Sequence, residues 1–257
     1  MMKKTLNIKV LGNVAPFSSL KKNCSGYLIN DKKTNILLDC GFGISKYFSQ
    51  AKDMENLTII ISHFHKDHYS DIYSIGYASY CFNKLGLLSK KINVYIPKMF
   101  ENEEGYEDYK LFKCFKENYF NIIEYEKDTI IEFNGFKIDF YLTNHIVKNY
   151  AIRILYNNKK ISYSGDMGFF NIDEISEFFS NSDLLICETT YLISDNKDDI
   201  NHLNTKQATL LSIKSKVKKL YFSHTWPKFK RILYYDEIKQ FLGYNNIEIC
   251  RKNKIYF

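Results

Sequence analysis

Short apolar runs recur along the whole chain, most of them four to seven residues long and rich in Ile, Val, Leu, Tyr and Phe. Runs of this length and composition are typical of buried strands. We expect strands at Leu6–Leu11, Tyr27–Asn30, Ile36–Asp39, Leu57–Ser62, Val94–Ile96, Ile130–Phe133, Phe136–Leu142, Ala151–Tyr156, Lys160–Ser164, Leu184–Cys187, Leu220–Ser223 and Ile247–Cys250. The Asn134-Gly135 pair and the segment "YNNKK" at Tyr156–Lys160 predict hairpin turns.

Helix-like stretches lie between these runs, at Asp71–Leu85, Tyr106–Phe120, Ile172–Phe179, Thr205–Lys218 and Asp236–Leu242. Hairpins and strand–helix–strand units are thus mixed, which predicts an α/β sandwich of two mixed sheets with helices outside. "NILLDCGFG" in the first half and "KISYSGDMG" in the second share a strand, an aspartate and a glycine turn. This similarity predicts an approximate half-and-half repeat. The prolines are scattered and no low-complexity linker occurs, so we expect one domain over residues 1–257.

Composition narrows the class of protein only slightly. The chain is 45% hydrophobic and 25% charged, as ordinary globular proteins are. A net charge of +7 fits a phosphate-bearing ligand, but it is too small and dispersed to predict a long nucleic-acid track. The six cysteines form no close-spaced pair, and no segment resembles a signal peptide or a bilayer span. We therefore expect reduced thiols, a cytoplasmic protein and no membrane partner.

Half of the six histidines lie within "SHFHKDH", directly after the apolar run at Leu57–Ile61. In extended chain, residues two apart point to the same side, so His63 and His65 can reach one metal ion together. Asp67 and His68 follow a turn and would reach a neighbouring point. A single site needs three or four N or O ligands. The split therefore predicts two ions, each completed by ligands from elsewhere.

Three further donors end strand-like runs: His145, Asp166 and His224. The carboxyl ends of strands are where α/β proteins gather their sites. A carboxylate can bridge two ions, so Asp166 is the expected bridge. The expected ligand sets are His63, His65, His145 and Asp166 for one ion and Asp67, His68, Asp166 and His224 for the other. Taken alone, a histidine such as His145 would more often be structural.

With these residues the chain resembles the metallo-β-lactamase fold hydrolases, through the HxHxDH motif, "LLDCG" with Asp39, "SGD" with Asp166 and "SH" with His224. The resemblance covers nearly the whole chain. It implies an αββα sandwich with two divalent ions, zinc in the first place and manganese as the alternative. It also implies that Asp39 orients ligands from behind.

The sixth histidine points to one branch of that superfamily. Glu188 in "LLICETTY" and His202 in "NHLNTKQATLL" resemble the ribonuclease Z and related phosphodiesterase branch. The resemblance implies that His202 donates a proton to the leaving oxygen and that Glu188 is its acidic partner. Two ions would bind the phosphodiester and lower the pKa of a bridging water, with Asp67 contributing at the catalytic centre. Alternatively, His202 is an ordinary residue at a helix start.

The length of one segment predicts a small substrate. Ribonuclease Z is expected to carry its tRNA-gripping arm between the positions of His145 and Asp166, but here only a hairpin fills that interval. The chain looks most like compact phosphodiesterases of the anti-Pycsar type, which are homodimers that destroy cyclic mononucleotides such as cCMP and cUMP. Phage evasion of host signalling, inside the host cytoplasm, is then the expected context. Candidates for base or phosphate contacts are Tyr77, Tyr80, Tyr106, Tyr109, Phe112, Lys228, Lys230 and Arg231, although core packing or a solvated turn explains them equally well.

Other functions stay open. A tRNA 3′-processing endonuclease shares the motifs, and a non-catalytic homologue that binds metal or nucleotide would keep the same residues. A β-lactamase or glyoxalase shares the fold, but neither uses a histidine at the position of His202.

Overall fold

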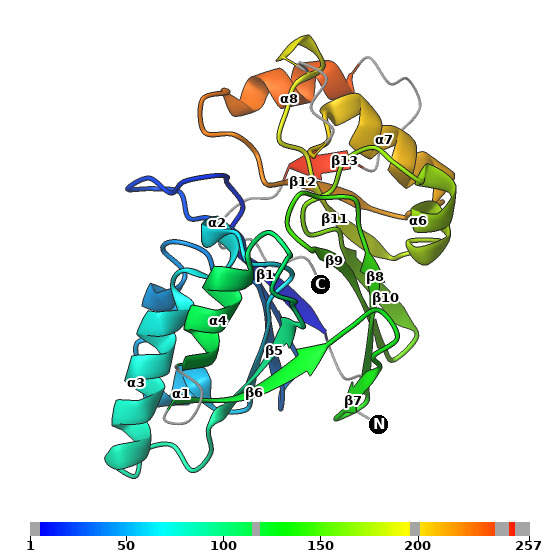
Figure 1. Cartoon of the computed structure of the whole chain (residues 1–257). Coiled ribbons are helices and arrows are strands. Elements are labelled where there is room, and N and C mark those ends of the chain that lie inside the picture. Colours follow the sequence, from blue (N-terminus) through cyan, green and yellow to red (C-terminus); the bar gives the residue numbers. More distant parts are fainter. Residues whose placement is uncertain (1–5, 115–118, 196–200, 240–246, 250–257) are drawn as a thin grey trace. The chain divides into compact units, whose positions relative to one another are not determined.

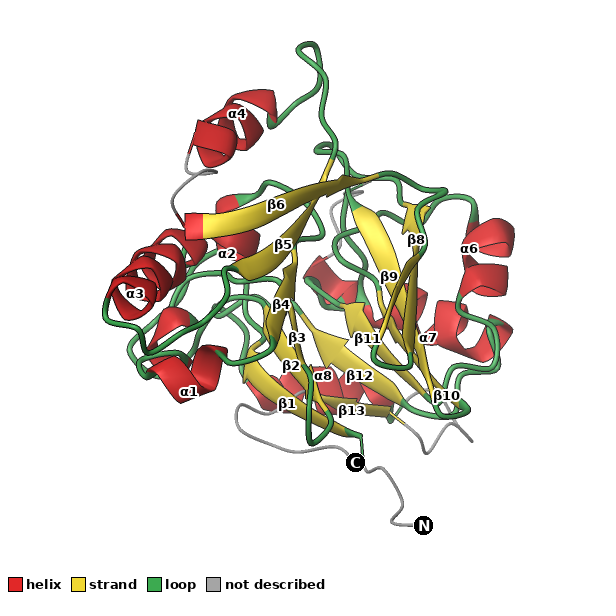
Figure 2. Ribbon diagram, turned by 90° about the horizontal axis from the view of Figure 1, so that it is seen from below, coloured by secondary structure: helices red, strands yellow, loops and turns green. Residues whose placement is uncertain are grey.

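The computed structural model describes residues 6–114, 119–195, 201–239 and 247–249. By their contacts the described residues form two compact units, the first within Met1–Tyr125 and the second within Glu126–Cys250. Each unit contains one mixed sheet with helices against it (Figures 1 and 2). The expected architecture of two mixed sheets flanked by helices is confirmed. The single-domain boundary remains a prediction.

The first sheet has six strands in sequence order: β1 (Asn7–Gly12), β2 (Gly26–Asn30), β3 (Asn35–Leu38), β4 (Leu57–Ile60), β5 (Ile92–Pro97) and β6 (Phe120–Tyr125). β1, β2 and β3 pair antiparallel, and β3 to β6 pair parallel. All four residues of β4, Leu-Thr-Ile-Ile, are buried, which explains why its sequence does not alternate between apolar and charged positions.

The parallel strands of this sheet are joined by crossovers that contain helices, as parallel pairing requires. These helices are η1 (Ser45–Tyr47), α1 (Ala51–Met54), α2 (Lys66–Tyr69), α3 (Ile72–Lys84) and α4 (Tyr106–Cys114). α3 buries Ile72, Ile75, Gly76 and Ser79. A Cβ at Gly76 would come within 2.7 Å of the Phe120 ring, so the missing side chain lets α3 approach β6 closely.

The second sheet has seven strands in the order β13-β12-β11-β10-β9-β8-β7. Their bounds are β7 (Ile131–Phe133), β8 (Phe136–Leu142), β9 (Tyr150–Tyr156), β10 (Lys159–Tyr163), β11 (Leu184–Glu188), β12 (Leu220–Ser223) and β13 (Ile247–Ile249). Both expected hairpins are present. Asn134 and Gly135 join β7 to β8, and Asn157 and Asn158 join β9 to β10, all four with positive φ as two-residue turns of this kind require.

The helices of the second unit are α6 (Ile172–Phe178), η2 (Ile193–Asp195), α7 (Thr205–Lys214) and α8 (Arg231–Ile238). They pack on the parallel strands through a core of buried residues that includes Phe179, Leu211, Phe222 and Tyr234. α7 begins with a capping box, in which the side chains of Asn204 and Gln207 each accept a hydrogen bond from the other's backbone N–H.

The two units repeat the same strand order. β3 in the first and β10 in the second are each the strand where antiparallel pairing ends and parallel pairing begins. "NILLDCGFG" contains β3 and "KISYSGDMG" contains β10. The similarity between those two segments therefore marks equivalent places in the two sheets, and the expected repeat is confirmed.

Several boundaries differ from the expectations. The sequence predicts no strand at β6, because it places Phe120 at the end of a helix. In the structure α4 stops at Cys114 and Phe120 begins β6; residues 115–118 are not among the described residues. α7 ends at Lys214 rather than Lys218, because Lys216 adopts φ +52° and closes a Schellman motif with Val217. α8 begins at Arg231, five residues earlier than expected. The expected end of that helix, Leu242, is not among the described residues.

The buried cysteines Cys24, Cys40 and Cys187 are free thiols, as are Cys81 and Cys114; Cys250 is not among the described residues. Burial raises the pKa of the Cys187 thiol. Among the described helices, none combines the length and the apolar character needed to cross a bilayer.

Candidate metal-binding and catalytic residues

The chain segment that follows β4 brings the first group of donors together. We call His63, His65, Asp67 and His68 the first donor cluster. His65 is extended and caps the single-turn helix α2, where the His68 N–H donates to the His65 carbonyl. The rings of His63 and His65 lie 4.8 Å apart, and those of His63 and His68 lie 4.1 Å apart. The short distance between His63 and His65 agrees with their expected orientation to one side.

Asp39 holds this cluster from behind. Its carboxylate is fully buried, and it accepts hydrogen bonds from the Ser62 N–H (2.7 Å) and the Ser62 hydroxyl (2.8 Å). His68 Nδ1 lies 2.7 Å from Asp39 Oδ2, and Nδ1 must be the protonated nitrogen to donate there. In this tautomer the lone pair of His68 is on Nε2, which is the arrangement that metal-binding histidines need.

The Ser62 hydroxyl links the Asp39 carboxylate to a second histidine, His63. The Ser62 hydroxyl donates to Asp39, so it can accept a hydrogen bond from His63 Nδ1 at 3.0 Å. His63 is then fixed in the tautomer that leaves Nε2 deprotonated. Asp39 has φ +58°, an unfavourable conformation for a non-glycine residue, as is typical where function constrains the backbone.

Asp166 is central to the donors of the second unit. We call His145, Asp166 and His224 the second donor cluster. Asp166 is 1% exposed; its Oδ1 lies 3.2 Å from His224 Nε2, and its Oδ2 lies 3.9 Å from His145 Nε2. Each carboxylate oxygen thus faces a different imidazole. This is the arrangement expected of a carboxylate that can bind two ions.

The loop that carries Asp166 is fixed through its backbone. The Asp166 carbonyl accepts hydrogen bonds from the Thr143 hydroxyl (2.9 Å) and the Asn149 amide (2.6 Å). The preceding Gly165 has φ +58°, and a Cβ there would lie 2.4 Å from Asn149 Oδ1. Glycine at this position is required both by the backbone conformation and by the close approach of Asn149.

A second hydroxyl relay supports His224. His224 Nδ1 lies 2.9 Å from the Thr190 hydroxyl, which in turn donates to Glu188 Oε2 at 3.0 Å. Thr190 stands two residues after the end of β11, as Ser62 does after β4 in the other unit. The two units therefore use the same device: a carboxylate, a hydroxyl and an imidazole in series.

Glu188 also holds the sixth histidine. His202 Nδ1 lies 3.0 Å from Glu188 Oε1, and that oxygen also accepts from the backbone N–H groups of Met167 and Leu203. Oε1 therefore has three donors, and Oε2 has two, the N–H and the hydroxyl of Thr190. Both oxygens of Glu188, which is 1% exposed, are thus fully hydrogen-bonded. The His202 side chain is 20% exposed, so it keeps access to a ligand.

The His202 ring lies close to two imidazoles of the second donor cluster. Its centroid is 5.2 Å from that of His145 and 5.3 Å from that of His224. Donor atoms of Asp166, His202 and His224 lie within 4.8 Å of one another. His145 Nδ1 lies 3.1 Å from the Asn201 carbonyl, so this histidine too presents Nε2 toward Asp166.

The other candidates have different surroundings. Tyr109 and Phe112 pack on buried Phe64 and belong to the core. Tyr106 packs on Tyr109, and Tyr77 stacks on Tyr80 and is 61% exposed. Arg231 donates to the Ile249 carbonyl, Lys228 pairs with Asp195, and exposed Lys230 caps α8.

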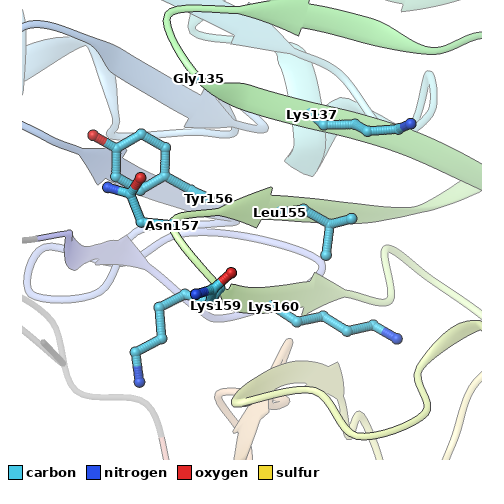
Figure 3. A pocket seen from close by; sticks show the side chains of 8 residues that line it. Gly135, Lys137, Leu155, Tyr156, Asn157, Lys159 and Lys160 are labelled. Carbon is cyan, nitrogen blue, oxygen red and sulfur yellow. The ribbon is translucent and has the colours of Figure 1, made fainter.

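One hollow of about 400 Å³ lies at the tips of two hairpins in the second unit. Figure 3 shows its lysines, with Lys159 directed away from Lys137 and Lys160. Each of these lysines has a partner: Glu132 for Lys137, Asp183 for Lys159 and the Ser180 carbonyl for Lys160. None of the candidate donors lines this hollow, so it adds nothing to the site.

The sequence analysis did not identify Ser62 or Thr190. A signal exists for both, because each is a hydroxyl residue placed two positions after a buried strand and close to an acidic residue or a histidine. The signal is weak, since Ser and Thr are common at strand ends. Two aromatic residues were also not predicted: Tyr191, whose ring lies 6.3 Å from the His202 ring, and Trp226, whose ring lies 5.7 Å from the Tyr191 ring.

Comparison with known proteins gives a family match. A sequence model described as "Anti-Pycsar protein Apyc1" matches residues 6–231. The probable metallo-hydrolase YhfI of Bacillus subtilis is 24% identical over 220 residues, which covers 85% of this chain and 86% of that protein. A ribonuclease Z of Saccharolobus islandicus is 24% identical over 272 aligned residues, covering 88% of this chain and 91% of that protein.

Solved structures give the same fold. The crystal structure of the metallo-β-lactamase fold protein YhfI from Bacillus subtilis superposes with a TM-score of 0.86 at 22% identity, covering 98% of both chains. The short form of human tRNase Z superposes with a TM-score of 0.71 at 17% identity, also over 98% of both chains. These likenesses confirm the metallo-β-lactamase fold expected from the motifs.

Proposed function

This chain belongs to the anti-Pycsar protein Apyc1 family, and from that premise we propose that it is a metal-dependent phosphodiesterase that hydrolyses a small phosphodiester. We infer that the substrate is a 3′,5′-cyclic mononucleotide such as cCMP or cUMP. The chain is a hydrolase of the metallo-β-lactamase fold, with metallo-hydrolase and ribonuclease Z relatives.

We propose that the two donor clusters together hold two divalent ions. His63, His65, His145 and Asp166 would hold one, and Asp67, His68, Asp166 and His224 the other. The donor chemistry fits, because imidazole nitrogen and carboxylate oxygen are ligands that Zn²⁺ accepts, with Mn²⁺ as the alternative. Four of the histidines, His63, His68, His145 and His224, have Nδ1 against an acceptor, which leaves Nε2 for a metal. Bound ions would supply positive charge against the phosphate and a water nucleophile at neutral pH, and Asp67 would contribute to that centre as a ligand.

The observation that carries the proposal is the contact between His202 Nδ1 and Glu188 Oε1. A departing sugar alkoxide is a poor leaving group and must receive a proton. Glu188 fixes the imidazole orientation and stabilises its protonated form, so His202 can donate the proton from Nε2. The β-lactamase and glyoxalase branches of this fold do not use a histidine at this position.

The length of the β9–β10 hairpin supports a small substrate. The chain passes from His145 to Asp166 through β9, a two-residue turn and β10, all of which are described. No segment is left over to form a tRNA-gripping arm in that interval. The matches to ribonuclease Z keep tRNA 3′ processing as a second candidate, since they extend over most of the chain.

A panel of phosphodiesters tests the proposal. The metal-loaded protein would be incubated with 3′,5′- and 2′,3′-cyclic nucleotides, bis-p-nitrophenyl phosphate and a precursor tRNA. We expect hydrolysis of cyclic mononucleotides to the linear monophosphate. Cleavage of the tRNA alone would favour the second candidate. No cleavage with zinc or manganese would favour a non-catalytic protein that binds metal or nucleotide.

We further propose a cytoplasmic homodimer that removes cyclic-nucleotide defence signals, in a host cell if the protein is phage-encoded. The free cysteines fit a reducing compartment. Sedimentation analysis would test the oligomeric state, and a Pycsar-protected strain expressing the protein would test immune evasion. A monomer in the first measurement, or unchanged phage resistance in the second, would contradict these two proposals separately.

A further inference from the structure

An aromatic pair in the second unit lies beside His202 and is not used by the proposed chemistry. Tyr191 follows Thr190, and Trp226 stands two residues after His224. The Tyr191 ring is 6.3 Å from the His202 ring, and the Trp226 ring is 5.7 Å from the Tyr191 ring at 68°. Both side chains are partly exposed. A partly exposed aromatic surface next to the proposed proton donor has a natural ligand in a flat heterocycle.

We propose that Tyr191 and Trp226 form the wall that receives the nucleobase of the substrate. This inference rests on the proposed function and adds the residues that recognise a nucleotide as opposed to any other phosphodiester. Stacking is tolerant of base identity, because every base has a π-face. The wall therefore selects for the presence of a base and leaves the choice among bases to other contacts.

Tyr191 is held in register with His202 by the backbone. Its N–H donates to the Leu203 carbonyl at 3.1 Å, and its own carbonyl accepts from the Thr205 N–H at 3.2 Å. Tyr191 and Asn204 form a parallel bridge. The segment that carries His202 therefore runs alongside Tyr191, so a base on the wall and a leaving oxygen near His202 would be positioned by one rigid unit.

Trp226 is linked to His224 through Tyr234 and Thr190. The backbone N–H of Trp226 donates to the Tyr234 hydroxyl at 3.2 Å, and that hydroxyl donates to the Thr190 carbonyl at 2.9 Å. Tyr234 is 1% exposed, and Thr190 is the residue that orients His224. A buried phenol thus links the wall to the relay behind His224. Preorganisation of this kind lowers the entropy lost on binding.

Neighbouring groups fix the indole itself. Lys228 Nζ lies 4.6 Å from the Trp226 ring centroid and is held by Asp195 at 2.9 Å. Phe229 meets the indole edge to face, with centroids 6.1 Å apart. A cation over an indole face is attractive and restricts the ring. The indole is consequently a positioned surface rather than a loose side chain.

Trp226 is the sole tryptophan of the chain, which allows a direct test. The metal-loaded protein would be titrated with a slowly hydrolysed phosphorothioate 3′,5′-cyclic nucleotide while tryptophan emission is followed. We expect saturable quenching. The matching cyclic ribose phosphate without a base should cause none. Equal responses to both ligands, or no response at a concentration that saturates inhibition of turnover, would overturn the proposal.

The kinetics of variants provide a second test of the nucleobase site. Trp226→Ala should raise KM for the cyclic nucleotide by about 5- to 100-fold, the range expected for loss of one stacked base, with a much smaller change in kcat. Trp226→Phe and Tyr191→Phe keep a ring and should stay within about threefold of wild type. For the base-free substrate, Trp226→Ala should change little. A similar rise in KM for both substrates would indicate a structural role only and contradict the wall.

The two proposals fail in different ways. Base-dependent quenching without hydrolysis of any phosphodiester would contradict the proposed function but support Tyr191 and Trp226 as the nucleobase site. Hydrolysis of cyclic nucleotides that is unaffected by Trp226→Ala would support the proposed function and contradict the nucleobase site. Absence of both binding and hydrolysis would overturn both.

Discussion

His202 and Glu188 are joined through Nδ1 and Oε1 at 3.0 Å, and the same carboxylate reaches His224 through the Thr190 hydroxyl. One buried acidic residue thus orients two imidazoles that differ in proposed role, one a proton donor and the other a metal ligand.

His202→Ala should lower kcat for a cyclic nucleotide by roughly 10²- to 10⁴-fold, the usual contribution of a general acid. The loss should be much smaller for bis-p-nitrophenyl phosphate, because p-nitrophenolate leaves without a proton. Steady-state kinetics on both substrates, with metal content measured by plasma mass spectrometry, checks this. Equal losses on both substrates would contradict the proton-donor role, and loss of metal would show that His202 acts as a ligand instead.

Thr190→Val should weaken metal binding by roughly 10- to 100-fold, because the variant keeps the shape but removes the hydroxyl between Glu188 and His224. Thr190→Ser is the matched control and should bind metal as wild type does. Competition with a chromogenic chelator measures the affinity. Ser62→Ala should behave like Thr190→Val, since Ser62 links Asp39 to His63 in the same way.

Gly165→Ala should destabilise the protein more than Gly135→Ala. Both glycines have positive φ, so alanine costs roughly 1 kcal/mol at either position. At Gly165 the new Cβ would also meet Asn149 Oδ1 at 2.4 Å, whereas at Gly135 its nearest neighbour is 3.6 Å away. Urea unfolding gives the free energies, and activity should fall only for Gly165→Ala, since that loop carries Asp166. Similar effects at the two positions would show that the contact with Asn149 is unimportant.

Removal of metal with EDTA should abolish activity and lower the thermal midpoint, because ions that bind only the folded state stabilise it by mass action. Added Zn²⁺ or Mn²⁺ should restore both. Differential scanning fluorimetry and turnover, followed across the same metal titration, test this. A thermal midpoint that does not change with metal, while activity does, would contradict binding of the ions at the buried histidine clusters.

Asp183→Asn should lower the free energy of unfolding by about 1 kcal/mol at pH 7 and by less near pH 3. Burial of the Asp183 carboxyl raises its pKa, but hydrogen bonds from Lys218 Nζ and the Lys160 N–H outweigh that effect, and the net pKa is lowered. A lowered pKa gives stability that is present above the unfolded-state value and is lost as pH falls through the folded one. Urea unfolding of both proteins across pH tests the sign. A difference that grows toward acid would contradict it.

Local patterns in the chain were enough for the strands, the hairpins and the proposed ligands. Most expected strands agree with the structure within one or two residues, because a buried strand is a short apolar run with an abrupt polar end. The donors were found for the same reason: His63, Asp166 and His224 follow such ends. Helix ends were less predictable, since Lys216 closes α7 through a backbone conformation that lysine does not favour.

Only the tertiary structure decided which residues support these donors. Asp39 and His68 are 29 positions apart, and Thr190 and His224 are 34 apart, so no local pattern relates them. Their contacts exist because adjacent parallel strands bring distant strand ends to one edge of a sheet. The same pairing of β11 with β12 places Tyr191 near Trp226. The sequence by itself therefore determined the chemistry of the proposed ligands, and the folding of each sheet decided how they are oriented and which aromatic rings stand beside them.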